Sequence, residues 1–588
     1  MKRLLFGFIC ALALSGCAAT YDHGTPTLGD KPPAGASAPV TVGIIALNDF
    51  HGALEPPNQS VLADSGDGHL VQVPAGGAAW LASAVDTLRR EYADSVTVAA
   101  GDLISASQVS SSIFLDEPAI GVMNRIGLDF SAVGNHEFDS GSDELLRKQN
   151  GGCAKYTQRQ PCQVEQFGGA KFQYLAASTH RADGSTIFPA TGLKSFGTGA
   201  AKVTIGFIGL TLKGTKDLVP AAGIPGITFA DEADTINALV PKLKDEGADA
   251  IVVLIHQGGH TDPPDPNGCS GFTGDILPIL ARLDPRVDVV VSGHTHWAYV
   301  CNYGDVDPSR PFLLTSAGVY GELLTDITLS IDPAAGRVVA KRAHNVIVQS
   351  RPYVASRSEI PNSPLFPQFT PRPDVTDYVK LYTDRAASVA LRPVGRIAQA
   401  ALKGVGPDGG PAGNLIADAD LAATRPAGAQ IAFINPFGVR AALQPTADGT
   451  LTFGDIYKTQ PFGDSLITQT MTGAELKAVL EQGFDNDGPE QHLTGSMGFR
   501  YWYDNSRPAG DRIVRMELDG KPIDPGADYR VTTDTYLVGG GDTFTLFGTQ
   551  RGAVTGIKDI EALEAWIKGE TPRAVPQEER AIAAGPAH

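Results

Sequence analysis

Short apolar runs alternate with helix-spaced segments along the N-terminal half of the chain. Helical spacing of apolar residues covers residues 78–90, 232–244 and 275–283, and each segment lies between two apolar runs. Strands that alternate with helices in this way predict an α/β fold. The predicted strands are residues 40–47, 95–100, 128–133, 172–177, 203–210, 250–255 and 287–291.

Five of these seven strands end directly in histidine, aspartate or asparagine beside glycine or another small residue. Sites in α/β sheets gather at the carboxyl ends of strands, so we expect these side chains to lie together. Five of the chain's 12 histidines belong to the strand-end motifs, which chance would rarely produce. The predicted ligands among them are Asp49, His51, Asp102, Asn135, His256, His294 and His296.

These ligands are oxygen and nitrogen donors in the number that two divalent ions need, with one carboxylate shared between the ions. A lone His51 or His256 would more often be an ordinary polar or core residue, so the prediction rests on the set. His294 and His296 can both be ligands only if the backbone turns or is extended between them, and Gly293 suits such a turn. We predict a centre of two divalent ions, drawn from zinc, manganese, cobalt and magnesium.

A second domain is predicted after a linker. Proline and serine are frequent from residue 351 to 373, and residues 374–391 have a helical pattern, which together favour a linker at 351–391. Glycine-rich turns and mixed strands then extend from 392 to 568, and residues 569–588 resemble a loose tail. The first domain would accordingly cover residues 40–350.

The N-terminus has the pattern of an export signal. Lys2 and Arg3 precede an apolar run at residues 4–14 that is too short to span a bilayer. Residues 14–17, Leu-Ser-Gly-Cys, resemble a bacterial lipobox, with Cys17 as the lipid-modified first residue after cleavage of residues 1–17. The alternative is a plain secretory signal with a chance cysteine. Residues 18–39 are predicted to be a flexible tether, so we expect a lipid-anchored protein of the cell envelope, in the periplasm or on the outer membrane.

Composition and net charge indicate which kinds of binding partner the chain can have. With 588 residues, 42% of them hydrophobic and 19% charged, the chain is typical of a soluble globular protein of two or three domains. A formal net charge of −18 argues against a nucleic-acid partner, which requires a basic surface. Small anions are not excluded, because a few arginines and bound cations can dominate one site. A monomer is compatible with these features.

The cysteine count agrees with export. Cys10 would leave with the signal and Cys17 would carry lipid, which leaves four of the six cysteines. In an oxidising compartment, an even number favours two disulfides, most simply Cys153–Cys162 and Cys269–Cys301. The alternative is a set of free or metal-binding thiols.

The ordered strand-end motifs resemble those of the calcineurin-like metallophosphoesterases. The motifs are Asp49-x-His51, Gly101-Asp102, Gly134-Asn135-His136-Glu137, His256 and Gly293-His294-x-His296. Residues 134–139 and the C-terminal features below are similar to the bacterial 5′-nucleotidase/UDP-sugar hydrolase family, over about residues 40–565. The resemblance implies a four-layer α/β/β/α sandwich followed by an α+β substrate-specificity domain.

The resemblance also divides the site residues by role. Asp102 would be shared between two metal ions, and His136 with Asp139 would be a catalytic pair. Asp139 would hold His136 as an imidazolium that stabilises charge on the phosphoryl group, while a metal-activated water attacks phosphorus. The alternative for Asp139 is the N-cap of a helix at residues 140–148. One ion would be held by Asp49, His51, Asp102 and His296, and the other by Asp102, Asn135, His256 and His294.

Substrate recognition would belong to the C-terminal domain. By resemblance, Phe462 and Tyr536 would sandwich a nucleobase, Asp542 would accept hydrogen bonds from ribose, and Arg440 would contact phosphate, with Asn435 also at the site. The other interpretation is that the aromatic residues belong to the core and that Gly539–Gly541 form a turn. The chain departs from its relatives in lacking arginine at 404–413 and in having Asp464 where asparagine is frequent.

The predicted activity is hydrolysis of 5′-nucleotides to nucleosides and phosphate. The enzymatic alternatives are a 2′,3′-cyclic nucleotide phosphodiesterase and a UDP-sugar hydrolase. A third alternative, of a different class, is a nucleotide-binding surface lipoprotein without turnover.

Overall fold

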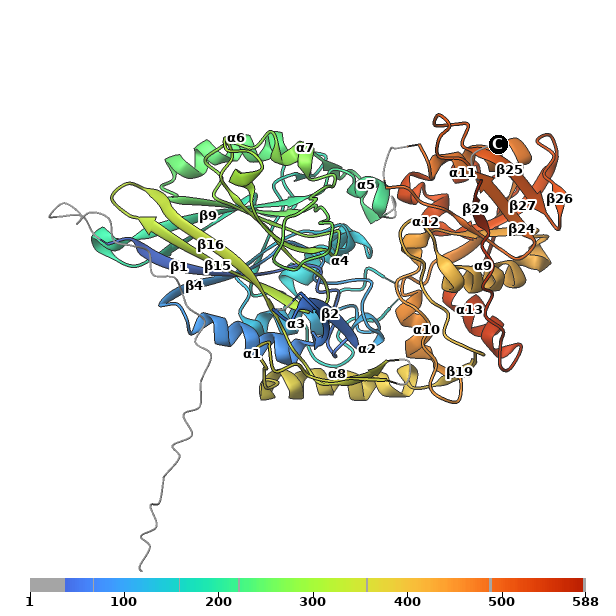
Figure 1. Ribbon diagram of the computed structural model, residues 1–588, viewed down its shortest axis with the longest axis horizontal. Coiled ribbons are helices and arrows are strands. Elements are labelled where there is room, and N and C mark those ends of the chain that lie inside the picture. Colours follow the sequence, from blue (N-terminus) through green and yellow to red (C-terminus); the bar gives the residue numbers. More distant parts are fainter. Residues whose placement is uncertain are drawn as a thin grey trace, which may run out of the picture.

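The computed structural model describes residues 38–584 except 67, 158, 220–222, 356–357 and 486–488. The predicted signal peptide, Cys10, Cys17 and the tether up to residue 37 lie outside the described residues. Figure 1 shows a larger N-terminal body, coloured blue to yellow, beside a smaller C-terminal domain, coloured orange to red. No helix in the described ranges is long and apolar enough to cross a membrane.

Two six-stranded sheets form the centre of the N-terminal body. In the first sheet, β1 pairs in parallel with β4, and Leu47 lies opposite Ala99, so both strands end at the same edge. The first sheet has the order β16 (Arg337–Ile347), β15 (Leu323–Asp332), β1 (Val40–Leu47), β4 (Asp94–Ala99), β5 (Phe130–Ala132) and β6 (Gln173–Leu175). The second has the order β13 (Ala298–Asn302), β14 (Leu313–Ala317), β12 (Val289–Ser292), β11 (Ala250–His256), β9 (Val203–Thr211) and β8 (Thr191–Phe196).

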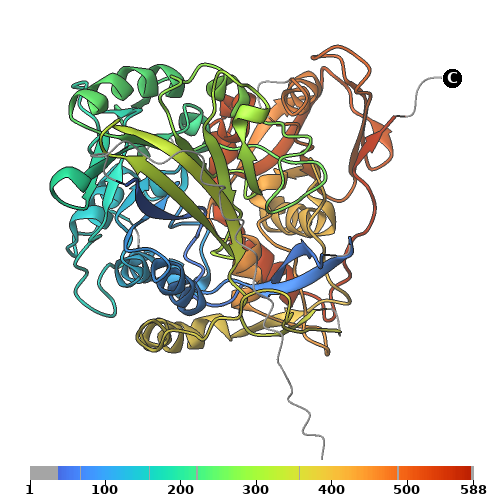
Figure 2. The same ribbon diagram turned by 60° about the vertical axis from the view of Figure 1, so that its left-hand side comes forward.

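Helices cover the outer faces of both sheets, which completes the four layers (Figures 1 and 2). Between the sheets, residues such as Ile44, Val98, Phe207 and Val252 are fully buried in one apolar cluster. One helical layer consists of α1 (Ala78–Arg89) and α3 (Glu117–Ile126), with α8 (Pro373–Ala390) packed against both, and the other of α6 (Glu232–Asp245) and α7 (Leu277–Leu280). The predicted α/β sandwich is confirmed.

All seven predicted strands are present, and two of the three predicted helices have nearly their predicted length. The third, predicted at residues 275–283, is the four-residue α7. Pro278 lies in the first turn of α7, where proline is tolerated, whereas a helix that began at residue 275 would place it further inside.

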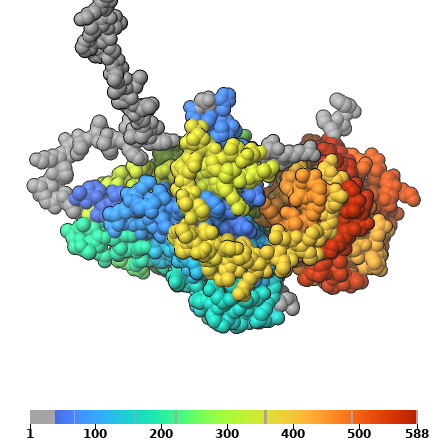
Figure 3. Space-filling model, turned by 90° about the horizontal axis from the view of Figure 1, so that it is seen from below, coloured from blue at the N-terminus to red at the C-terminus, as the bar shows by residue number. Residues whose placement is uncertain are grey.

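The predicted linker segment is packed against the N-terminal body. Val375, Tyr378 and Tyr382 of α8 are buried in the same apolar cluster as α1 and α3. Seen from below in Figure 3, the yellow segment lies across the blue surface and continues towards the orange domain. The segment therefore follows the first domain before entering the second.

The C-terminal domain combines a five-stranded and a four-stranded sheet with helices. The first sheet contains β23 (Thr494–Gly495), β20 (Ile431–Ile434), β27 (Asp528–Asp534), β22 (Ser465–Thr472) and β28 (Val554–Lys558). The second contains β26 (Lys521–Pro522), β25 (Ile513–Leu518), β24 (Phe499–Tyr503) and β29 (Ala581–Ala583). The helices include α9 (Gly410–Thr424), α10 (Phe453–Thr459), α11 (Gly473–Gln482), α12 (Thr535–Val538) and α13 (Asp559–Lys568).

The segment expected to be a loose tail, residues 569–588, differs from that expectation as far as Ala584. Its strand β29 pairs in parallel with β24, and the buried Arg580 forms two hydrogen bonds of 2.6 and 3.0 Å with the carboxylate of Asp418 in α9. A buried arginine needs such a partner, so this ion pair attaches the segment to the domain.

Both predicted disulfides are confirmed. Cys153 is bonded to Cys162 and Cys269 to Cys301, with Cα–Cα distances of 5.6 and 5.0 Å. The alternative of free or metal-binding thiols is thereby excluded for these four residues.

Candidate active site

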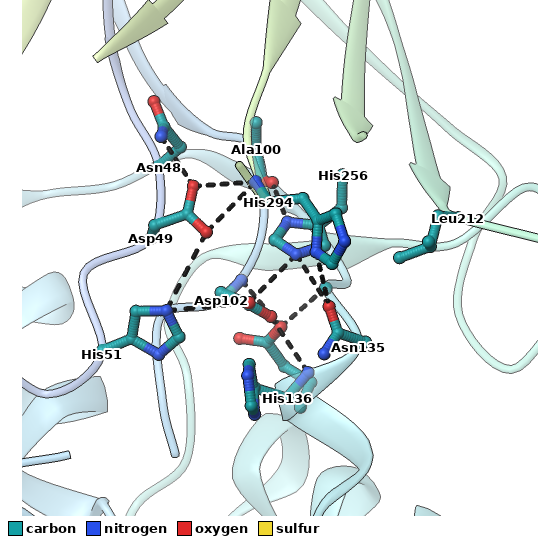
Figure 4. Close-up of polar contacts among 12 residues, drawn as sticks. Asn48, Asp49, His51, Ala100, Asp102, Asn135, His136, Leu212, His256 and His294 are labelled. Carbon is teal, nitrogen blue, oxygen red and sulfur yellow. Dashed lines mark hydrogen bonds and ion pairs between the residues drawn. The ribbon is translucent and has the colours of Figure 1, made fainter. Parts of the chain in front are cut away.

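The predicted ligands converge where the strands of both sheets end, and all except His296 are labelled in Figure 4. They form two clusters, and within each cluster one ligand atom per residue lies within 4.8 Å of the others. Asp102 lies between the clusters, since its Oδ2 is 3.8 Å from His51 Nε2 and 3.0 Å from His256 Nε2. The clusters are Asp49, His51 and His296, and Asp102, His256 and His294.

Backbone carbonyls fix the tautomers of two of these histidines. His51 Nδ1 lies 2.9 Å from the carbonyl of Ser105, and His256 Nδ1 lies 2.8 Å from that of Ala100. A carbonyl only accepts, so each Nδ1 carries a proton and each Nε2 faces the cluster. A hydrogen bond of this kind is how proteins orient a metal-ligating histidine.

Polar atoms of other predicted ligands lie close to the two Nε2 atoms. His51 Nε2 lies 3.1 Å from His296 Nε2, and His256 Nε2 lies 3.1 Å from Asn135 Oδ1. His294 Nδ1 is also 3.1 Å from that oxygen. Ligands of one ion with bonds of about 2.0–2.1 Å are separated by about this much. The donor set therefore fits two divalent metal ions.

The electrostatics of the clusters agree with metal binding. Burial lowers the pKa of His51 and of His294 to about 3, so both imidazoles are neutral and able to act as ligands. Burial also disfavours the charged form of His256, but the charge and hydrogen bond of Asp102 raise the pKa of His256 to about 10. Without a metal ion, the additional proton on His256 would thus occupy the position that a metal cation can fill.

Most of the predicted ligands have a strained backbone. Such left-handed conformations cost energy for residues other than glycine and cluster at functional sites. These backbone conformations direct ligand side chains from neighbouring loops towards the two clusters. The φ angles are 49° for Asp49, 45° for His51, 52° for Asp102, 71° for His294 and 60° for His296.

Glycines allow the loops to approach one another closely. A Cβ on Gly134 would lie 2.0 Å from Asp102 Oδ1, and one on Gly293 would lie 2.8 Å from Asp49 Oδ2. The expectation that Gly293 provides the turn between the two histidines needs correction: the left-handed residues are His294 and His296 themselves. Gly293 instead leaves room for the carboxylate of Asp49.

Two supporting residues were not predicted from the sequence. The buried carboxylate of Glu137 accepts hydrogen bonds from the backbone N–H groups of Gly134 (2.6 Å), Asp102 (2.9 Å) and Leu103 (2.8 Å), and so joins two ligand loops. The amide of Asn48 donates to Asp49 Oδ2 at 2.7 Å and orients that ligand. Both are polar residues directly beside a ligand or its loop, which is the signal that could have identified them.

His136 and Asp139 form the predicted pair. His136 Nδ1 lies 2.7 Å from Asp139 Oδ2, and both side chains are mostly buried. Burial opposes the charged imidazole, but the carboxylate of Asp139 prevails and the pKa of His136 is raised. The alternative role of Asp139 as a helix cap is wrong, because α4 (Ser142–Asn150) begins after Gly141, its N-cap residue.

Two residues of the C-terminal domain reach this pair. The rings of Phe462 and His136 lie parallel within 9°, with centroids 6.0 Å apart. The guanidinium of Arg440 lies 5.9 Å from the centroid of Phe462, and its buried Nη2 has no hydrogen-bond partner among the described residues. A buried donor without a partner is costly, so Arg440 offers a hydrogen bond to an anionic ligand.

The remaining predicted substrate residues form a second group. Asp542 is buried, and its carboxylate accepts from Tyr536 Oη and from Asn435 Nδ2, each at 2.6 Å. The positive charge of Arg440 acts on Asp542 as well as on His136, so this group lies beside the first. The base sandwich of Phe462 and Tyr536 remains a prediction.

Comparison with known proteins agrees with this geometry. The family profile described as calcineurin-like phosphoesterase matches residues 43–298, and that of the 5′-nucleotidase C-terminal domain matches residues 393–549. Endonuclease YhcR of Bacillus subtilis (strain 168) is 30% identical over 549 residues, which are 92% of this chain but only 41% of that protein. Cell wall protein Lmo0130 of Listeria monocytogenes serovar 1/2a is 26% identical over 578 residues, 93% of this chain and 69% of the relative.

A solved structure shows the same fold. The 5′-nucleotidase precursor from Thermus thermophilus superposes with a TM-score of 0.73 at 24% identity, over 92% of this chain and 99% of that one. The two matching profiles, one for each domain, show that the chain belongs to the 5′-nucleotidase family, the calcineurin-like metallophosphoesterases with a C-terminal 5′-nucleotidase domain.

Proposed function

We propose that the protein is an exported phosphohydrolase that converts 5′-nucleotides to nucleosides and phosphate. The observation that carries this proposal is the approach of Phe462 to His136 across the two domains, with Arg440 beside Phe462. An aromatic ring can stack on any nucleobase, and an arginine suits phosphate oxygens. Both therefore lie where an ester held by the C-terminal domain would reach the metal clusters.

Each group has a role that its chemistry supports. Two bound divalent ions would supply Lewis-acid stabilisation and a nucleophilic water. Arg440 would bind the phosphate, and His136, kept protonated by Asp139, would stabilise charge that develops on the phosphoryl oxygens. Phe462 and Tyr536 would bind the base, and Asp542 with Asn435 would bind the ribose.

An extracytoplasmic location is supported by the two disulfides, since disulfides persist in oxidising compartments. The similarity to a protein named as a cell wall protein points the same way. The lipid anchor at Cys17 is part of the proposal.

A nuclease is the second candidate, because the relative with 30% identity is named an endonuclease. The net charge of −18 disfavours a polynucleotide substrate. Cyclic nucleotides and UDP-sugars remain alternatives within the same site chemistry.

A substrate panel tests the proposal. The protein would be loaded in turn with Mn²⁺, Co²⁺, Zn²⁺ and Mg²⁺ and offered AMP, 2′,3′-cyclic AMP, a UDP-sugar and single-stranded DNA. We expect metal-dependent release of phosphate that is fastest from AMP. Faster cleavage of DNA or of a diester would replace the proposed activity, and no turnover with any metal would refute it.

A further inference from the structure

Arg159 bonds to both domains at once. Its Nη1 donates to the carbonyl and to the Oγ of Ser112, each at 2.7 Å, and its Nη2 donates to Tyr457 Oη at 2.8 Å. Ser112 Oγ and Tyr457 Oη are themselves 2.6 Å apart. Ser112 ends α2 (Val109–Ser112) of the N-terminal body, and Tyr457 lies in α10 of the C-terminal domain. Arg159, Ser112 and Tyr457 thus form a hydrogen-bonded junction between the domains, in which the charged guanidinium is a donor.

The loop that contains Arg159 is attached to the N-terminal body. Arg159 lies in the loop closed by the Cys153–Cys162 disulfide. The N–H of Cys162 donates to Glu117 Oε1 at 3.0 Å, and Glu117 is paired with the buried Arg147 at 2.8 Å. The loop is therefore attached to α3 and α4, and the guanidinium has a fixed base.

Tyr457 transmits this position to the substrate residues. The side chain of Tyr457 is buried, so Tyr457 and α10 can change position only together. The carbonyl of Thr459, the last residue of α10, accepts from the backbone N–H of Arg440 at 2.8 Å. Residues 460–462 continue directly from α10 to Phe462. The position of α10 consequently sets both residues that face His136.

The N-terminal side of the junction leads to a metal-ligand loop. Residues 105–108 precede α2, and the carbonyl of Ser105 is the one that orients His51. The contact therefore connects the loop that holds a ligand with the helix that holds the substrate residues.

We propose that Arg159 is a positioning residue that, through Tyr457, places Arg440 and Phe462 over His136. The inference rests on the proposed function for its effect on catalysis, but its effect on the position of α10 is independent of any activity. Three hydrogen bonds from one cation to Ser112 and Tyr457 exceed what an incidental surface contact provides.

The test compares Arg159→Ala, Tyr457→Phe and the double variant with the wild type. Tyr457→Phe removes only the hydroxyl and keeps the packed ring. Arg282→Ala is the matched control, because Arg282 is an exposed arginine paired with Asp231 and Asp234 in the N-terminal body. With AMP, we expect KM to rise about tenfold in each single variant, as for loss of a charged hydrogen bond, with a small change in kcat. Because the two residues belong to one hydrogen-bond network, the loss in the double variant should be smaller than the sum of the single losses.

Hydrogen exchange supplies a readout that needs no turnover. Amides of residues 453–464 should exchange about tenfold faster in Arg159→Ala and in Tyr457→Phe, while amides of β1, β4 and β11 keep their protection. Unchanged exchange in residues 453–464 together with unchanged KM would overturn the proposal, as would additive effects in the double variant. If wild-type protein fails to hydrolyse AMP, the proposed function fails, and the exchange data alone decide the role of Arg159.

Discussion

The rings of His136 and Phe462 lie parallel within 9° and 6.0 Å apart, although the two residues belong to different domains. The imidazole lies on one side of Phe462, and we expect a nucleobase to stack on the other face. The contact brings the substrate domain directly to the phosphoryl-binding pair.

Replacing Phe462 with alanine should weaken nucleotide binding. Stacking on an aromatic ring is worth about 1–3 kcal/mol per base, so KM for AMP should rise by about one order of magnitude or more. Ribose 5-phosphate lacks a base and serves as the control substrate, whose kcat/KM should stay nearly constant. An equal loss with both substrates would show that Phe462 acts on His136 and not on a base.

His136→Ala should separate catalysis from metal binding. We expect kcat to fall by roughly 10²–10⁴, the usual contribution of a side chain that acts on the reacting group. The metal content, measured by mass spectrometry of the purified variant, should stay at the wild-type value. A variant that loses one ion would instead identify His136 as a ligand.

Glu137→Gln should loosen the metal site without touching an ion. Three backbone N–H groups point at the carboxylate of Glu137, and a glutamine amide would face one of them with its own donor. Loss of such supporting contacts typically lowers metal affinity about 10–100-fold. Titration with a competing chelator would measure this. Glu232→Gln, also a buried change but in α6, is the control and should bind metal normally.

Glu322 should make stability depend on pH. Burial raises the pKa of Glu322 from 4.5 to about 8, and its Oε1 lacks a hydrogen-bond partner within the described part of the chain. Between these two pH values the folded state binds more protons than the unfolded state, so stability falls as pH rises through the window and stays lower above it.

Glu322→Gln should remove this dependence. The variant should match the wild type near pH 5 and exceed it above pH 8 by at most about 5 kcal/mol in the free energy of unfolding. Denaturant unfolding at both pH values measures the difference. The exposed Glu91→Gln is the control, and a Glu322→Gln variant with the wild-type pH profile would contradict the prediction.

The metal site was predictable because each ligand directly follows an apolar strand, and parallel strands end at one edge. Its supports were not, because Glu137 bonds to the backbone of Asp102 and Leu103 and Asn48 also bonds to that of Ala317 and Gly318, all distant in sequence. The long antiparallel strands β15 and β16 were also not predicted, since their partners are distant in the chain. The junction of Arg159 and Tyr457 depends on how two domains dock, and no local pattern encodes that. The final segment looked loose because its anchor, Arg580, pairs with a residue far away in sequence.

The central claim is that the C-terminal domain recognises a nucleoside whose 5′-phosphate is removed at the metal clusters. The most direct measurement is the ratio of kcat/KM for AMP to that for ribose 5-phosphate in the metal-loaded wild-type protein. We expect AMP to be favoured by at least about tenfold, the value of one stacked base. Equal values for the two substrates, or a preference for ribose 5-phosphate, would contradict it.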